Sequence, residues 1–237
     1  MLNRHFKTNL AVNIIIASVL IVVAMVSLNV SYITPASGNT AIYHGNTNRL
    51  EVALMFNVYW GTEYIEPILQ VLETHSAKAT FFVGGSWVAK NGDTLKKIVS
   101  KGHEIGCHGY SHKDAKDLTY AQNTDEIMLT NKLVKELTGI NIRLFAPPSG
   151  SLGSEMFRAC QDLNLDVIMW TRDTIDWRDK DSNLVLKRAT KDIQNGDFIL
   201  MHPTEHTLKA LPLIIGTLEG KGLSLKTVSQ CLAPQQV

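Results

Sequence analysis

Short apolar or β-branched runs alternate along this chain with segments in which apolar residues recur at helical spacing. The runs have strand lengths, and the segments between them are long enough for a helix that leads to a parallel neighbour. The pattern predicts an α/β fold, and seven such runs favour an irregular (β/α) barrel of parallel strands. The predicted strands are Glu51–Asn57, Ala77–Val83, His103–Cys107, Arg143–Ala146, Asp166–Trp170, Phe198–Met201 and Leu225–Val228. The predicted helices cover residues 63–74, 92–101, 121–138, 153–164, 182–194 and 206–219.

One apolar stretch near the N-terminus is longer than any predicted strand. It runs from Leu10 to Val30, which is sufficient for one transmembrane helix. Arg4 and Lys7 precede it, and the positive-inside rule keeps them in the cytoplasm, so the rest of the chain is expected outside the cell membrane. A cleavable signal peptide has a shorter apolar core and an Ala-x-Ala-like site, so we expect an uncleaved, single-pass anchor. The alternatives are secretion after signal cleavage and a buried core helix.

The anchor divides the chain into four parts. Residues 1–9 form the predicted cytoplasmic N-terminus and residues 10–30 the transmembrane anchor. Residues 31–48 contain Pro, Gly, Asn, Ser and Thr, as is typical of a linker. Residues 49–237 are long enough for one domain with a single sizeable core.

Charge and cysteine content narrow the possible partners. The chain has 23 basic and 22 acidic residues and no basic stripe that would follow a phosphate backbone, so we expect no nucleic-acid partner. Its three cysteines, Cys107, Cys160 and Cys231, are an odd number and indicate no disulfide framework. We expect buried thiols instead.

Two histidines lie four residues apart directly after a predicted strand. His108 and His112 follow the strand that ends at Cys107. Imidazole is a common nitrogen ligand of zinc and related metals, and this spacing can direct two rings at one ion. We interpret the pair as candidate metal ligands, the alternative being hydrogen-bonded structural histidines.

Other polar and aromatic residues also follow predicted strands. In parallel α/β barrels these positions converge on one face, which carries the chemistry. His202 lies there and suits acid or base catalysis, because imidazole titrates near neutrality. The structural alternatives are Asp176 as a turn cap, Trp177 as a core residue and Pro147-Pro148 as a stiff loop. The strand ends together favour metal-assisted hydrolysis of a polar, ring-shaped substrate. They are Asn57–Gly61, His108–His112, Phe145–Gly150, Asp173–Trp177 and Leu200–Pro203.

In this order, the strand-end motifs resemble those of the NodB-homology polysaccharide deacetylases, carbohydrate esterase family four. The resemblance covers the chain from about Leu50 to Leu232. Asn57-Val58 and Trp60-Gly61 resemble most the sporulation-associated, membrane-anchored branch. The segments similar to family motifs or strands are Val52–Phe56, Lys78–Val83, His108–His112, Asp173–Trp177 and Leu200–His202.

The resemblance implies a reaction and a cofactor. In the family, a divalent metal such as zinc is held by one aspartate and two histidines and polarises an N-acetyl carbonyl and its attacking water. A second aspartate is the base, and a histidine protonates the leaving amine. The implied metal ligands are His108 and His112, and the implied catalytic residues are His202 as the acid, Asp176, and Asn57 at the motif of the base. The implied substrate-binding residues are Trp177, Pro147, Pro148, Tyr59 and Trp60.

The chain departs from the family at charged positions. The two adjacent aspartates of the first motif are absent, since no carboxylate occurs from Val52 through Thr62. An amide cannot accept a proton as a carboxylate does, and it is a poorer metal ligand than an anionic oxygen. Ala146 stands where the third motif has an arginine, which predicts that Asp176 lacks its partner.

These departures leave three alternatives for the function. The first is a hydrolase that releases N-acetyl groups from cell-envelope glycan, which we expect to be peptidoglycan, with weak activity. Glu205 or His206 would then be the replacement metal ligand. The second is a glycan-binding or scaffold module in the envelope whose hydrolysis is impaired, with a role in sporulation as one option. A third, with Cys107 as a soft ligand or redox group, is disfavoured because adjacent strand residues point to opposite faces.

Overall fold

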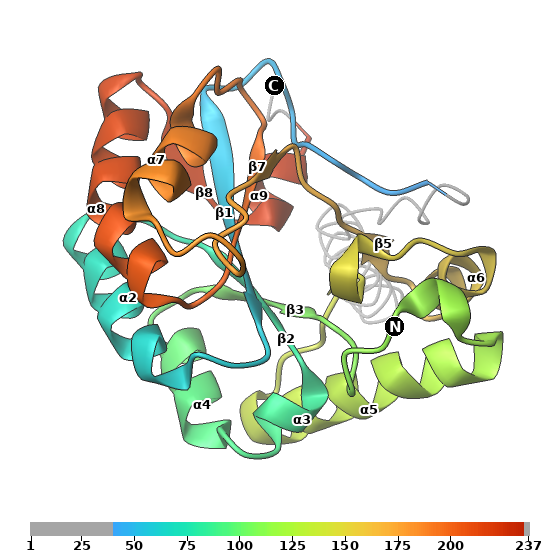
Figure 1. Ribbon diagram of the computed structural model, residues 1–237. Coiled ribbons are helices and arrows are strands. Elements are labelled where there is room, and N and C mark those ends of the chain that lie inside the picture. The colour runs from blue at the N-terminus through green and yellow to red at the C-terminus, as the bar shows by residue number, and fades with distance from the viewer. Residues whose placement is uncertain (1–39, 235–237) are drawn as a thin grey trace, which may run out of the picture. The chain divides into compact units, whose positions relative to one another are not determined.

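Eight short parallel strands form one curled sheet in the computed structural model, which describes residues 40–234 (Figure 1). The strands are β1 (Glu51–Val58), β2 (Thr80–Val83), β3 (Glu104–Cys107), β4 (Leu144–Phe145), β5 (Asp166–Val167), β6 (Arg172–Asp173), β7 (Phe198–Met201) and β8 (Ser224–Lys226). Their order is β5-β4-β3-β2-β1-β7-β6, and β8 pairs with β1. Because β5 and β6 lie at opposite ends of this order and do not pair, the sheet is a half-barrel.

Helices connect most of the successive strands, and α9 follows the last one. They are α2 (Thr62–Thr74), α3 (Gly85–Val88), α4 (Gly92–Ser100), α5 (Tyr120–Thr138), α6 (Ser154–Asp162), α7 (Ser182–Thr190), α8 (Glu205–Gly220) and α9 (Val228–Leu232), with 3₁₀ turns η1 (Ala115–Asp117) and η2 (Pro148–Gly150). Helices α2, α7 and α8 gather on one side, and α5 and α6 lie beside each other (Figure 1).

The structure confirms the α/β class, the parallel sheet and all seven predicted strands, with boundary shifts of a few residues. The six predicted helices are also present. Strand β6 was not predicted, because its two residues are charged and carry no apolar run. The short helices α3 and α9 were also not predicted.

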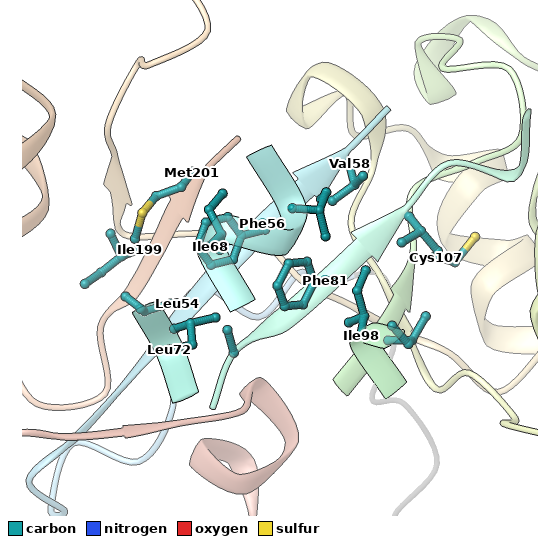
Figure 2. Packing of buried hydrophobic residues seen from close by; sticks show 14 of the residues in the cluster. Leu54, Phe56, Val58, Ile68, Leu72, Phe81, Ile98, Cys107, Ile199 and Met201 are labelled. Carbon is teal, nitrogen blue, oxygen red and sulfur yellow. The ribbon is translucent and has the colours of Figure 1, made fainter. Parts of the chain in front are cut away.

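Alternate residues of β1 pack on opposite faces of the sheet, as a strand requires. Leu54 and Phe56 point toward the helices, where they meet Ile68 and Leu72 of α2 (Figure 2). Phe56 also stacks on Phe81 of β2 with ring centroids 5.0 Å apart. This apolar layer fixes the register of the central strands.

The inner face of the curled sheet holds a second, smaller apolar cluster. Ala53 and Met55 of β1 belong to it, together with Phe82 of β2 and Val228 of α9. Asn57 lies two positions after Met55 in β1, so its side chain is on the same inner face, at the carboxyl end of the strand. The alternation of side chains in β1 thus places a polar amide at the carboxyl end of the strand.

The folded domain begins before the predicted boundary at residue 49. Ile42 donates its backbone N–H to the Val167 carbonyl at 2.8 Å, and Gly45 donates to Gly196 at 2.8 Å. These bonds attach to the domain a segment that the sequence assigns to the linker of residues 31–48. In residues 40–234 no helix is long and apolar enough to cross a membrane. The predicted anchor at residues 10–30 lies outside the described range.

Candidate functional site

The carboxyl ends of the parallel strands surround a cavity of about 440 Å³, which we call the site cavity. It contains the predicted residues Asn57, Tyr59, Trp60, His108, His112, Trp177 and His202. Ser149, Trp170, Asp173 and Leu200 complete the lining, and the sequence did not single them out individually. Pro147 and Pro148 do not line the cavity, although they form the loop that presents Ser149.

His108 and His112 face each other, as their spacing predicts. Their ring centroids lie 5.1 Å apart at an interplanar angle of 73°. His108 is buried, and its Nδ1 lies 2.7 Å from the Ala146 carbonyl, which can only accept a hydrogen bond. Nδ1 therefore carries the proton, and Nε2 keeps a free lone pair.

Burial keeps the histidine pair neutral. It lowers the pKa of His108 to about 3, and it is also the main cause that lowers the pKa of His112. Glu126 of α5 holds the loop between them, because its Oε2 accepts hydrogen bonds of 2.6 Å from the backbone N–H groups of Tyr110 and Ser111. The geometry of the pair is thus set by a carboxylate outside the cavity lining.

His202, which lines the site cavity, forms a second pair with Asp176 behind it. The carboxylate of Asp176 is buried and accepts hydrogen bonds from His202 Nδ1 at 2.8 Å and from the His202 backbone N–H at 2.6 Å. Thr207 Oγ1 also donates to it. Burial acts to raise the pKa of Asp176, but the hydrogen bonds and charge of His202, with the Thr207 bond, outweigh it, so the pKa is lowered.

The arginine partner of Asp176 is absent, as predicted, but the carboxylate is not left unpaired. His202 and Thr207 satisfy the carboxylate, although the family arginine is replaced by Ala146. Since the ionised Asp176 fixes the proton on Nδ1, the Nε2 atom of His202 remains for chemistry. Asp176 itself does not line the cavity and acts through His202.

Asn57 and Tyr59 occupy the end of β1, where the family has carboxylates. Asn57 is only 5% exposed, and its Oδ1 atom is buried without a hydrogen-bond partner. The Tyr59 hydroxyl donates to the Tyr110 carbonyl at 3.0 Å, and its ring packs edge-on against His112. Among residues 40–234, Asp173 is the one carboxylate that lines the cavity, and it accepts the Ile175 backbone N–H at 2.8 Å.

The donors in the site cavity do not fit the aspartate-and-two-histidine site of the family. His108, His112 and the amide of Asn57 are neutral donors. The carboxylate of Asp173 forms no three-ligand group with the two histidines, so a divalent cation would lack the anionic ligand of the family site. Within residues 40–234, no group of three His, Cys, Asp or Glu side chains is arranged to hold a metal ion.

The proposed substitute ligands are engaged elsewhere. Glu205 forms an ion pair with Lys209 at 2.6 Å, and His206 Nε2 donates to the Asp176 backbone carbonyl. Neither supports the predicted replacement of the missing carboxylate. Cys107 packs in the apolar layer on the helix side of the sheet, and burial raises the pKa of its thiol to about 12, so the expectation that it points away from His108 is confirmed.

Comparisons with known proteins agree with this architecture. The Polysaccharide deacetylase family model matches residues 44–168. The uncharacterized protein YlxY of Bacillus subtilis is 39% identical over 81% of this chain and 60% of its own length. A Bacillus cereus peptidoglycan-N-acetylglucosamine deacetylase is 29% identical over 78% of this chain and 70% of its own length. This chain therefore spans less than two thirds of the first of these relatives.

A solved structure shares both the fold and a substantial part of the sequence. It is a CE4 family pseudoenzyme from Bacillus anthracis, with a TM-score of 0.81 and 38% identity. The match covers 84% of this chain and 71% of the pseudoenzyme. A mutant of that pseudoenzyme is described as having restored enzymatic activity, and it matches with the same TM-score.

Proposed function

Because this chain belongs to the polysaccharide deacetylase family, we propose that its domain binds N-acetylated cell-envelope glycan, with peptidoglycan as the polymer, and hydrolyses the N-acetyl groups slowly. The peptidoglycan deacetylases among its relatives support this substrate class. One observation carries the proposal. The His202–Asp176 pair is intact, whereas the same cavity has the amide of Asn57 where the family has its catalytic base.

The His202–Asp176 pair supplies the acid half of amide hydrolysis. Water adds to the acetyl carbonyl carbon, the C–N bond breaks, and the amine nitrogen takes a proton from Nε2 of protonated His202. Acetate and a free amine are the products. The ionised Asp176 stabilises the imidazolium and orients the ring through the 2.8 Å bond to Nδ1.

The base half of the reaction is weak. An amide oxygen at Asn57 does not take up the proton that the attacking water must lose. Members of the family generally depend on a metal, but here no carboxylate at the end of β1 supplies its anionic ligand. Binding of the acetylated sugar and protonation of the amine are therefore retained, whereas activation of water is impaired.

The second candidate is a glycan-binding or scaffold module without hydrolysis. It is favoured by the same amide at Asn57 and by the similarity to a CE4 family pseudoenzyme. The restored mutant of that pseudoenzyme supports the view that such a site can lack only part of its machinery. The two candidates differ in one observable, the release of acetate.

Acetate release from N-acetylated peptidoglycan measures that difference. We expect the wild-type rate to be roughly 10²–10⁴-fold below that of the Bacillus cereus peptidoglycan deacetylase, as is typical for loss of one general acid–base group. His202→Ala is expected to lower the remaining rate to background while the protein stays folded. A wild-type rate that His202→Ala leaves unchanged would show that His202 is not the acid, and no release at all would favour the binding module.

The cellular location is a further part of the proposal. We propose that residues 10–30 anchor the domain to the outer side of the cell membrane, with Arg4 and Lys7 in the cytoplasm. Membership of the sporulation-associated branch remains a prediction that rests on Asn57-Val58 and Trp60-Gly61.

A further inference from the structure

Trp60 and His202 form a stacked pair at the rim of the site cavity. Trp60 follows β1 and His202 follows β7, and these two strands are neighbours in the sheet. Their ring centroids lie 5.7 Å apart at an interplanar angle of 6°. The imidazole is thus held in its plane by the hydrogen bond to Asp176 and across its face by the indole.

Gly61 allows the two loops to approach this closely. Its φ angle of 73° is in the left-handed region, which glycine adopts without steric cost. A Cβ atom at this position would lie 2.0 Å from the Pro203 carbonyl oxygen, so any side chain would force the loops apart. The loop after β1 therefore rests directly on the loop that carries His202.

Trp60 remains substantially exposed beyond its contact with His202. The residue is 44% exposed although one face is stacked on His202, and no other ring or cation of residues 40–234 stacks on it. Trp177, which is 55% exposed, lines the same cavity. An exposed indole at this cavity offers a flat apolar surface, which matches the C–H face of a pyranose ring.

We propose that Trp60 is a two-faced positioning residue, whose inner face holds His202 against Asp176 and whose outer face binds a second sugar ring of the glycan. The inner contact is a property of the protein alone, whereas the sugar contact rests on the proposed function. Occupation of the outer face then immobilises the same indole that holds the acid. Trp60 would thereby connect the binding of an extended glycan to the geometry of His202.

Side-chain NMR of His202 tests the inner contact without any glycan. Protons that face an indole are shifted upfield by its ring current, and His202→Gln identifies their signals by loss. We expect Trp60→Leu to move the His202 ring protons downfield and Trp60→Phe to retain part of the upfield shift. Trp177→Leu serves as the matched control and should leave them in place. If Trp60→Leu is folded by circular dichroism and the His202 signals do not move, the inner contact is refuted.

Titration with N-acetylglucosamine oligomers tests the outer contact. We expect Trp60→Leu to weaken binding of the tetramer by roughly tenfold, the size of one aromatic contact, and to change binding of the monosaccharide little. Equal tetramer affinity of wild type and Trp60→Leu would overturn the second sugar site. Failure of the wild type to bind any oligomer would refute both the sugar site and the proposed function, whereas the NMR result on His202 would stand.

Discussion

Asn57→Asp is expected to raise acetate release from N-acetylated glycan at least roughly tenfold above the wild-type rate. The substitution is isosteric, so it places a carboxylate on the inner face of β1 without new contacts. Asn57 is nearly buried, and burial raises the pKa of a carboxyl group, which makes it a better proton acceptor near neutral pH. The same carboxylate adds an anionic oxygen to the cavity that contains His108 and His112.

The assay is performed with and without added zinc, so that a gain in metal binding is separated from a gain in proton transfer. Asn57→Leu is the matched control, because it removes the amide and introduces no acceptor, and it should not increase the rate. If Asn57→Asp binds glycan as wild type does and releases no more acetate under either condition, the missing carboxylate is not what limits hydrolysis.

Lowering the pH from 6.5 to 4 is expected to reduce the free energy of unfolding steeply. Burial holds the pKa of His108 near 3 in the folded protein, whereas an unfolded histidine titrates near 6.5. In this window the unfolded chain binds a proton that the folded chain does not, so stability falls as the pH falls. His108 alone contributes about 1.4 kcal/mol per pH unit. His103, with a pKa lowered to about 4 mainly by burial, acts in the same direction.

Urea unfolding at several pH values in the presence of a chelator measures this dependence. Replacement of His108 by Gln should reduce the slope by about one proton, and His103→Gln should do so independently. Asp176 acts in the same direction but at lower pH, because its lowered pKa also lets the unfolded chain bind a proton before the folded chain does. A free energy of unfolding that stays constant from pH 6.5 to 5 would show that His108 is not buried as a neutral group.

Local periodicity was sufficient to predict most of the fold. The alternation in β1 assigns Leu54 and Phe56 to one face and Met55 to the other, and each is fully buried as that pattern requires. Strand β6 could not be found in this way, because Arg172 and Asp173 form a ladder with β7 without any apolar signal. Its position depends on the neighbouring strand rather than on its own residues.

The site was predictable where residues are close in sequence and not where contacts are distant. His108 and His112 are four residues apart, so spacing alone indicated their pairing. The Asp176 hydrogen bonds to His202 and Thr207 join residues 26 and 31 positions apart, and no local pattern identifies Thr207. The sequence therefore predicted the loss of the arginine beside Asp176 but not the partners that replace it.

Calorimetric titration of the wild-type protein with a peptidoglycan oligosaccharide tests most directly whether the site cavity recognises the N-acetyl group although hydrolysis is impaired. The same oligosaccharide after chemical de-N-acetylation is the matched ligand. We expect wild type to bind the acetylated form with a dissociation constant within about threefold of the constant measured for Asn57→Asp. Wild type should bind the de-N-acetylated form more weakly, by a factor of about ten or more. Equal binding of both forms, or binding of neither, would contradict this expectation.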